Sequence, residues 1–124
     1  MTDALYHELI LDLNRHPLNK KELKKFDWRS RAHNPLCGDT VEISIKFNKN
    51  KISEIAWQGE GCAISTASAS LITDYLKNKN KSEIKKLNQT KVLELLGLSE
   101  INPTRMRCAL LSLTALQQGN NLTI

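Results

Sequence analysis

The sequence lacks any apolar run approaching the about 20 residues that a transmembrane helix needs, so we expect neither a membrane-spanning segment nor a membrane partner. It also lacks the basic region with which a signal peptide begins, because MTDALYHELILDL carries acidic residues there. We therefore expect a cytoplasmic protein. Hydrophobic residues make up 40% of the 124 residues and charged residues 25%, which is typical of a globular chain able to bury one core.

Arginine clusters are missing and aromatic residues are few, although the formal net charge is +5. The positive charge comes largely from NKKELKK and KNKNKSEIKK, where lysine is interleaved with polar residues. No stacking or base-reading pattern accompanies this charge, so we expect no nucleic-acid partner. A solvated face, or a surface that docks an acidic protein, fits the pattern better.

A first helix is predicted by apolar residues at helical spacing. These residues are Leu5, Leu9, Ile10 and Leu13. Thr2 is expected to cap its start, and Pro17 to end it, because a proline disfavours helical geometry in the residue before it. Residues 17–33 then read as a polar connector, which Phe26 and Trp28 are expected to anchor to the body of the domain.

The segment TVEISIKF predicts a half-buried antiparallel strand, since apolar and polar residues alternate along it. The residues that share its apolar face are Val41, Ile43, Ile45 and Phe47. Residues 48–51, NKNK, supply a turn, and ISEIAWQ follows as the partner strand. We therefore predict a β-hairpin.

Three further segments predict helices: STASASLITDYLKN, SEIKKLNQTKVLELLG and NPTRMRCALLSLTALQQG. Ser82 is expected to cap the second and Gly97 to end it, while Asn102 caps the third, Pro103 takes its first position and Gly119 ends it. The buried stripe of the third helix is expected to be Met106, Leu110, Leu113 and Leu116. The predicted fold class is α+β, with a small antiparallel sheet packed against helices in one domain of residues 1–124.

The chain has three cysteines and no Cys-x-x-Cys pair, so a zinc knuckle is excluded and the three thiols cannot all pair with one another. Cys37 is predicted in the turn that enters the first strand, and Cys62 in the loop before a helix. Cys108 is predicted near the amino-terminal end of the last helix. A helix amino terminus favours a thiolate, the form that binds metal or attacks sulfur.

Glycines flank two of the cysteines, in NPLCGD and GEGCAIS, where they allow the backbone to approach a bulky centre. Asp39 follows Cys37 by two positions and could turn an oxygen toward the same point. Three sulfurs and one oxygen would complete a tetrahedral shell for zinc or hold an iron–sulfur unit. Spacing alone leaves two alternatives open: a shared metal site, and three separate thiols that serve as small buried residues.

Three motifs in this order, NPLCGD, GEGCAISTASASLIT and NPTRMRCALLSLTAL, resemble the U-type iron–sulfur assembly family, which includes IscU, SufU and the amino-terminal domain of NifU. The opening LYHELILDLNRHPLNK is also similar. The resemblance implies that Cys37, Cys62 and Cys108 converge at one exposed end of an α+β fold to hold a nascent, transient iron–sulfur cluster. It implies that the same cysteines, with Asp39, bind zinc or iron. A cysteine desulfurase and iron–sulfur acceptor proteins are the implied partners.

We therefore expect a scaffold that accepts persulfide sulfur, and a zinc-dependent sulfurtransferase is the alternative. Cys37 is the expected acceptor in a Suf-like chain and Cys108 in an Isc-like one. Asp39 is the expected labile ligand, because a hard oxygen binds iron less tightly than soft sulfurs do. Arg107 is similar to the Suf type, whereas the short connection between the second and third cysteines is similar to the Isc type.

Two alternative functions belong to other classes. In a structural zinc or basic interaction module, the metal would only hold the fold. A thiol hydrolase is less well supported, because His7, His16 and His33 lie in the first helix and the connector without an evident carboxylate partner. We expect His7 on the helix surface, His16 at the helix end, and His33 as a spare ligand near Cys37.

Overall fold

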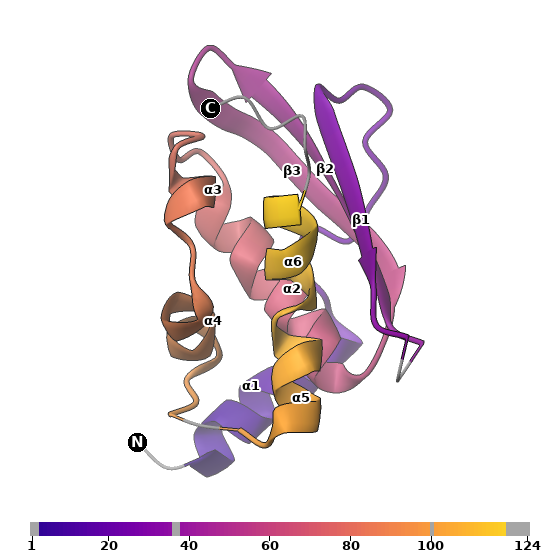
Figure 1. Cartoon of the computed structure of the whole chain (residues 1–124), viewed down its shortest axis with the longest axis vertical. Coiled ribbons are helices and arrows are strands. Elements are labelled where there is room, and N and C mark those ends of the chain that lie inside the picture. Colours follow the sequence, from indigo (N-terminus) through magenta and orange to yellow (C-terminus); the bar gives the residue numbers. More distant parts are fainter. Residues whose placement is uncertain (1–2, 36–37, 100, 119–124) are drawn as a thin grey trace.

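The structure is a computed structural model that describes residues 3–35, 38–99 and 101–118. Over these residues the chain forms a three-stranded antiparallel sheet in the order β1-β2-β3 and six helices, which confirms the α+β class (Figure 1). The elements in chain order are α1 (Asp3–Arg15), β1 (Trp28–His33), β2 (Thr40–Asn48), β3 (Lys51–Glu60), α2 (Ala63–Leu76), α3 (Glu83–Lys86), α4 (Gln89–Leu96), α5 (Pro103–Ala109) and α6 (Leu111–Gln118). None of the helices in these ranges is long and apolar enough to cross a membrane.

The predicted hairpin is confirmed as β2 and β3, which pair antiparallel from Thr40 opposite Glu60 to Asn48 opposite Lys51. Alternation along β2 buries Val41, Ile43 and Ile45 against the helices. The register shifts between Lys46 and Phe47, and Phe47 beyond that irregularity is only partly buried. One face of the sheet therefore contributes to the core, as the alternating pattern requires.

The prediction that residues 17–33 form only a connector is wrong, because β1 lies within them and pairs with β2 along its whole length. Two arginines in WRSRAH hide the strand pattern, since a six-residue edge strand has little apolar surface to show. Trp28 is buried as expected, but Phe26 is 41% exposed, and the guanidinium of Arg29 lies 3.8 Å from the centre of its ring. Trp28 therefore anchors this segment, and Phe26 does not.

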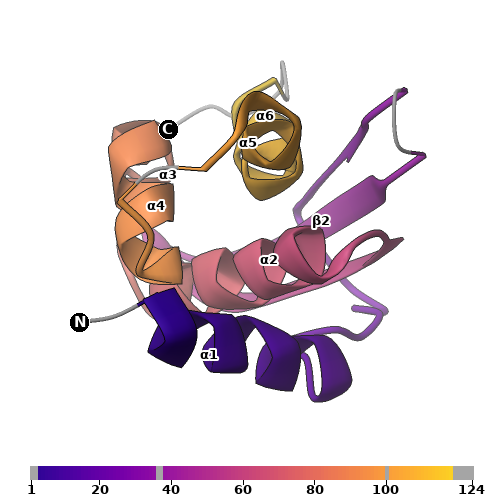
Figure 2. The same cartoon turned by 90° about the horizontal axis from the view of Figure 1, so that it is seen from below.

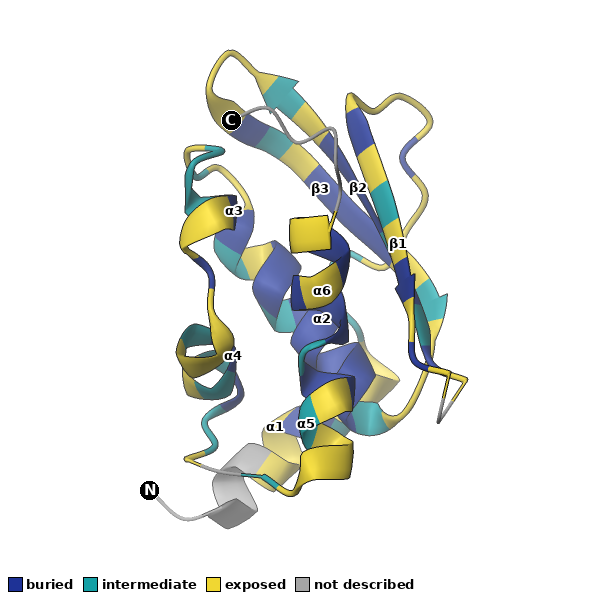
Figure 3. Ribbon diagram, in the orientation of Figure 1, coloured by how far each residue is buried: buried dark blue, intermediate teal, exposed yellow. Residues whose placement is uncertain are grey.

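Helix α2 lies at the centre of the molecule, between α1 and the α5–α6 pair, and it also contacts β3 and α4 (Figures 2 and 3). The residues that it buries are Ile64, Ser65, Thr66, Ala67, Ser68, Ala69, Ser70, Ile72, Thr73 and Leu76. Most of these side chains are small, so neighbouring elements approach the helix backbone closely. The hydroxyl groups then need partners: Thr73 donates to the Ala69 carbonyl at 2.7 Å, and Ser70 accepts the Leu18 N–H at 3.1 Å.

The helix predicted from Ser82 to Gly97 is two helices, α3 and α4. Leu87 is extended between them, and Asn88 caps α4 by accepting the Lys91 N–H at 2.8 Å. Ser82 makes no side-chain capping bond, which corrects its predicted role. Gly97 ends α4 in the left-handed conformation at φ 73°, as predicted.

The last predicted helix is also interrupted, at Leu110, which separates α5 from α6. Ser68 of α2 donates a 2.5 Å hydrogen bond to the Ala109 carbonyl, so the break is fixed by a contact that is distant in sequence. Asn102 caps α5 as predicted, by accepting the Arg105 N–H at 2.9 Å. Of the predicted stripe, Leu113 and Leu116 are buried, whereas Met106 and Leu110 are half-buried. The expected roles of Thr2 and Gly119 lie outside the described residues.

Candidate metal centre

Three of the predicted ligands lie together: one oxygen of Asp39 and the sulfurs of Cys62 and Cys108 are all within 4.8 Å of one another. Asp39 directly precedes β2, Cys62 precedes α2 and Cys108 belongs to α5, and these segments lie toward the same end of the molecule (Figure 1). Asp39 and Cys108 are buried, whereas Cys62 is exposed. The group is therefore anchored inside the fold and reaches the surface at one sulfur.

The turn before β2 sets the position of Asp39. The Asn34 N–H donates to the Asp39 carbonyl at 2.8 Å, and the Gly38 N–H donates to the Asn34 carbonyl at the same distance. Gly38 has φ 74°, a left-handed conformation that glycine adopts without strain. The backbone bonds thus orient Asp39 toward the interior, where its side chain is only 5% exposed.

A hydroxyl and a glycine hold the Asp39 carboxylate. Ser65 Oγ donates a 2.6 Å hydrogen bond to Asp39 Oδ2, and it also lies 3.6 Å from Cys62 Sγ. A Cβ atom on Gly61 would lie 3.0 Å from Asp39 Cγ, so only glycine leaves the carboxylate its present place. Ser65 was not among the predicted site residues, although its place three residues after Cys62 in GEGCAIS is a usable signal.

Cys108 departs from its sequence prediction. Because the helix breaks at Leu110, Cys108 is the second-to-last residue of α5 and does not lie near a helix amino terminus. Burial first, and then the neighbouring Cys62 and Asp39, raise the pKa of the Cys108 thiol from 9.0 to about 12. Without a cation this thiol therefore keeps its proton at neutral pH, contrary to the expected thiolate.

The donor set fits a borderline-soft cation. Two thiols and a carboxylate that crowd one another are the ligands that zinc and ferrous iron take, and a bound cation favours their deprotonated forms. The acids that raise the pKa of Cys108 would then become its fellow ligands. In its donor atoms this arrangement matches a tetrahedral site with one position left for a further ligand.

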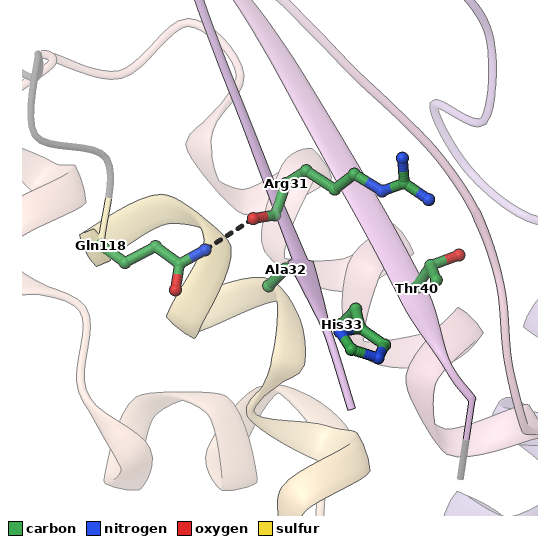
Figure 4. Close-up of a pocket in the computed structure, with 5 residues that line it drawn as sticks. All are labelled: Arg31, Ala32, His33, Thr40 and Gln118. Carbon is green, nitrogen blue, oxygen red and sulfur yellow. Dashed lines mark hydrogen bonds between the residues drawn. The ribbon is translucent and has the colours of Figure 1, made fainter. Parts of the chain in front are cut away.

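The other predicted site residues are placed as follows. Cys37 lies outside the described residues. His33 is exposed and lies outside the three-residue group, in a hollow of about 590 Å³ lined by Arg31, Thr40 and Gln118, where Gln118 donates a 2.5 Å hydrogen bond to the Arg31 carbonyl (Figure 4). The role of His33 as a spare ligand near Cys37 stays a prediction.

A second cavity, of about 360 Å³, opens directly beside the cysteines. His7 and Arg105 line it together with Cys62 and Cys108. His7 is exposed on α1, as predicted, but its place beside the sulfurs was not predicted. Arg107, whose residue type is similar to the Suf type, is an exposed residue of α5.

Comparisons with known proteins agree on one family. Residues 5–121 match the sequence model described as NifU-like N terminal domain. The iron–sulfur cluster assembly scaffold protein IscU of Streptococcus pyogenes serotype M1 is 31% identical, over 93% of this chain and 82% of its own length. The zinc-dependent sulfurtransferase SufU of Bacillus subtilis is also 31% identical, over 94% and 90% respectively. A proposed scaffold protein for the SUF system from Fervidobacterium islandicum has a similar crystal structure, with a TM-score of 0.74, 25% identity, and 90% of this chain and 93% of that one covered.

Proposed function

The chain belongs to the NifU-like N-terminal domain family, and from that premise we propose that it is an iron–sulfur cluster assembly scaffold that accepts sulfur from a cysteine desulfurase. The observation that supports this most directly is the meeting of Asp39, Cys62 and Cys108 within 4.8 Å, although they come from three distant segments. Relatives named as scaffolds support the same function.

We propose Cys37, Asp39, Cys62 and Cys108 as the ligands of iron or zinc, and the three cysteines as the holders of a nascent cluster. The described ligands supply two sulfurs and one oxygen. Cys37 is proposed as the fourth because it stands two positions before Asp39 in the chain. Asp39 is the ligand that a partner would displace most easily, since oxygen binds these ions less tightly than thiolate sulfur does.

In the proposed transfer, a thiolate of this chain attacks the outer sulfur of the desulfurase persulfide. A sulfur–sulfur bond forms on this chain, the one in the partner breaks, and the partner's cysteine leaves as a thiolate, so no oxidant or reductant is consumed. Reducing the transferred sulfur to sulfide takes two electrons from a separate donor. Cys37 and Cys108 remain the proposed acceptors, and the burial of Cys108 favours Cys37.

A second candidate function is a zinc-dependent sulfurtransferase that relays sulfur without building a cluster. A relative named for that activity, as similar to this chain as the scaffold relative, favours it. The same four ligands would serve, and zinc would hold the thiolates until the partner's sulfur arrives.

Anaerobic reconstitution with iron and sulfide separates the two candidates. A scaffold should develop stable charge-transfer absorption in the visible range and pass its cluster to an apo-acceptor. A sulfurtransferase should instead hold stoichiometric zinc and stimulate a desulfurase without cluster transfer. Native mass spectrometry before and after the desulfurase reaction would report metal and persulfide together. A protein that does neither would contradict both candidates.

A variant pair tests whether the metal only holds the fold. Asp39→Ala should impair sulfur acceptance or metal binding more than folding, whereas Asp74→Ala, at an exposed aspartate of α2, should change neither. If Asp39→Ala mainly lowers stability and leaves sulfur transfer intact, the metal is structural. The proposed partners are the desulfurase and iron–sulfur acceptor proteins, and the proposed compartment is the cytoplasm.

A further inference from the structure

Ser65 donates a hydrogen bond to the Asp39 side chain and has no part in the proposed sulfur transfer. Its hydroxyl is buried, with the residue only 8% exposed, and its 2.6 Å bond to Asp39 Oδ2 is short, as expected for a hydroxyl that donates to a carboxylate. The same oxygen lies 3.4 Å from the Cys108 carbonyl and 3.6 Å from Cys62 Sγ. Ser65 therefore touches all three members of the candidate centre.

We propose that Ser65 is the positioning residue of this centre, which fixes Asp39 as a ligand through one carboxylate oxygen. This inference rests on the proposed metal-binding function and adds a residue to it. A hydroxyl has a single proton, and the distances assign it to Asp39 Oδ2 in preference to the Cys108 carbonyl. With that oxygen engaged, the other one is left for the metal.

Ser65 and Gly61 together restrict the position of the Asp39 carboxylate. Gly61 lies next to both residues of this pair, since a Cβ atom there would lie 3.0 Å from both Asp39 Cγ and Ser65 Cβ. The carboxylate thus contacts the hydroxyl of Ser65 and the backbone of Gly61. If a partner displaces Asp39 from a metal, the freed carboxylate keeps its hydrogen bond from Ser65 inside the fold. This bond lowers the free-energy cost of the displacement.

Helix α2 provides a matched control one turn further on. Ser68 is also a buried serine whose hydroxyl donates to a carbonyl, that of Ala109, at 2.5 Å, and it belongs to the same helix face. Removing either hydroxyl leaves a buried acceptor without its donor, so both changes should cost stability. Of these two serines it is Ser65 that bonds Asp39, so its loss should change the coordination of a metal.

The test measures the affinity of the purified, metal-free protein for zinc by competition with a chromophoric chelator, and the visible spectrum of the cobalt(II) form. We expect Ser65→Ala to lower zinc affinity about 10-fold or more and to shift the cobalt spectrum. Ser68→Ala removes a bond to the residue next to Cys108, so it should lower the affinity less and leave the cobalt spectrum unchanged. In the Asp39→Ala background, Ser65→Ala should have no further effect on affinity. Unchanged affinity for Ser65→Ala, or an equal loss in that background, would overturn the proposal.

A second pair guards against a variant that does not fold. Thr and Val at position 65 have nearly the same shape and differ by the hydroxyl, so Ser65→Thr should bind zinc more tightly than Ser65→Val, and equal affinities would overturn the proposal. The parent function is tested separately with Cys62→Ser. If the wild-type protein and Cys62→Ser bind zinc equally, the proposed metal site itself is wrong, whatever Ser65 does.

Discussion

Gly61 lies against the side chain of Asp39, although 22 positions separate them in the sequence (61 minus 39). A Cβ atom at position 61 would lie 3.0 Å from Asp39 Cγ and 3.2 Å from Asp39 Oδ2, closer than side chains ordinarily pack. Gly61 does not adopt a left-handed φ, so glycine is needed here to leave space for the Asp39 side chain. The glycine that precedes Cys62 therefore leaves the space in which the Asp39 carboxylate lies.

Gly61→Ala should displace the Asp39 carboxylate and lower zinc affinity, because the added methyl group would lie only 3.0 Å from Asp39 Cγ. The protein should still fold, since the contact is with a side chain that can rotate. Gly97→Ala is the control: Gly97 ends α4 at φ 73°, so alanine there should cost about 1 kcal/mol of stability without changing zinc affinity. Chelator competition and thermal unfolding measure the two effects, and loss of affinity in both variants would contradict the prediction.

Two asparagine caps give a second matched pair. Asn102 caps α5, which carries Cys108, and Asn88 caps α4 by the same kind of bond. Replacing either by alanine should lower the free energy of unfolding by about 1 kcal/mol, because one N–H at the helix start loses its acceptor. Of the two, Asn102→Ala should also weaken zinc binding, since it loosens the helix that carries Cys108, a proposed ligand. Equal zinc affinity for both variants would show that α5 is positioned by its other contacts.

The sequence predicts the centre of this fold better than its edges. The β2–β3 hairpin follows from the strict alternation of TVEISIKF, and Asn102 and Gly97 cap and end helices where their residue types indicate. Strand β1 was missed because its stability comes from hydrogen bonds to β2, which no local pattern records. The break at Leu110 was missed for a similar reason, since the bond from Ser68 to the Ala109 carbonyl joins distant segments.

The candidate centre was also predicted only in part, because some of its features depend on contacts between distant segments. Motif order placed Asp39, Cys62 and Cys108 in one site, and the structure brings these three together. The protonation of Cys108 could not be predicted, because it depends on where α5 ends and on how deeply the thiol is buried. Ser65 was overlooked because a buried serine on a helix of small residues looks like packing until its partner is known.

The stability of the metal-free protein should fall at high pH because of Cys108. The folded state keeps the thiol proton up to a pKa of about 12, whereas the unfolded chain loses it near 9.0. Between these values the folded state binds more protons, so Cys108 contributes a fall in the free energy of unfolding as pH rises, of up to about 1.4 kcal/mol per pH unit. Below pH 9 the contribution is complete and constant.

Denaturant titrations of the chelator-treated protein at several pH values measure this effect. Cys108→Ala should show a shallower decline than the wild-type protein between about pH 9 and 12, because other groups titrate equally in both. Parallel curves for the two proteins would show that the folded state does not retain the Cys108 proton.

The two described thiols should also differ in reactivity, because Cys62 is exposed while Cys108 is 4% exposed and keeps its proton. A thiolate is the reactive form toward alkylating reagents, so at pH 8 iodoacetamide should modify Cys62 well before Cys108 in the metal-free protein. Mass spectrometry of the digested protein over a time course measures each site, and unfolding in urea should remove the difference.

Addition of zinc before the reagent should slow modification of Cys62, since a metal-bound sulfur is a poorer nucleophile. The metal-free sample is the reference for this comparison. If Cys108 reacts as fast as Cys62 without urea, then α5 opens in solution and the buried thiol is available to a partner's persulfide, which would restore Cys108 as a sulfur acceptor equal to Cys37.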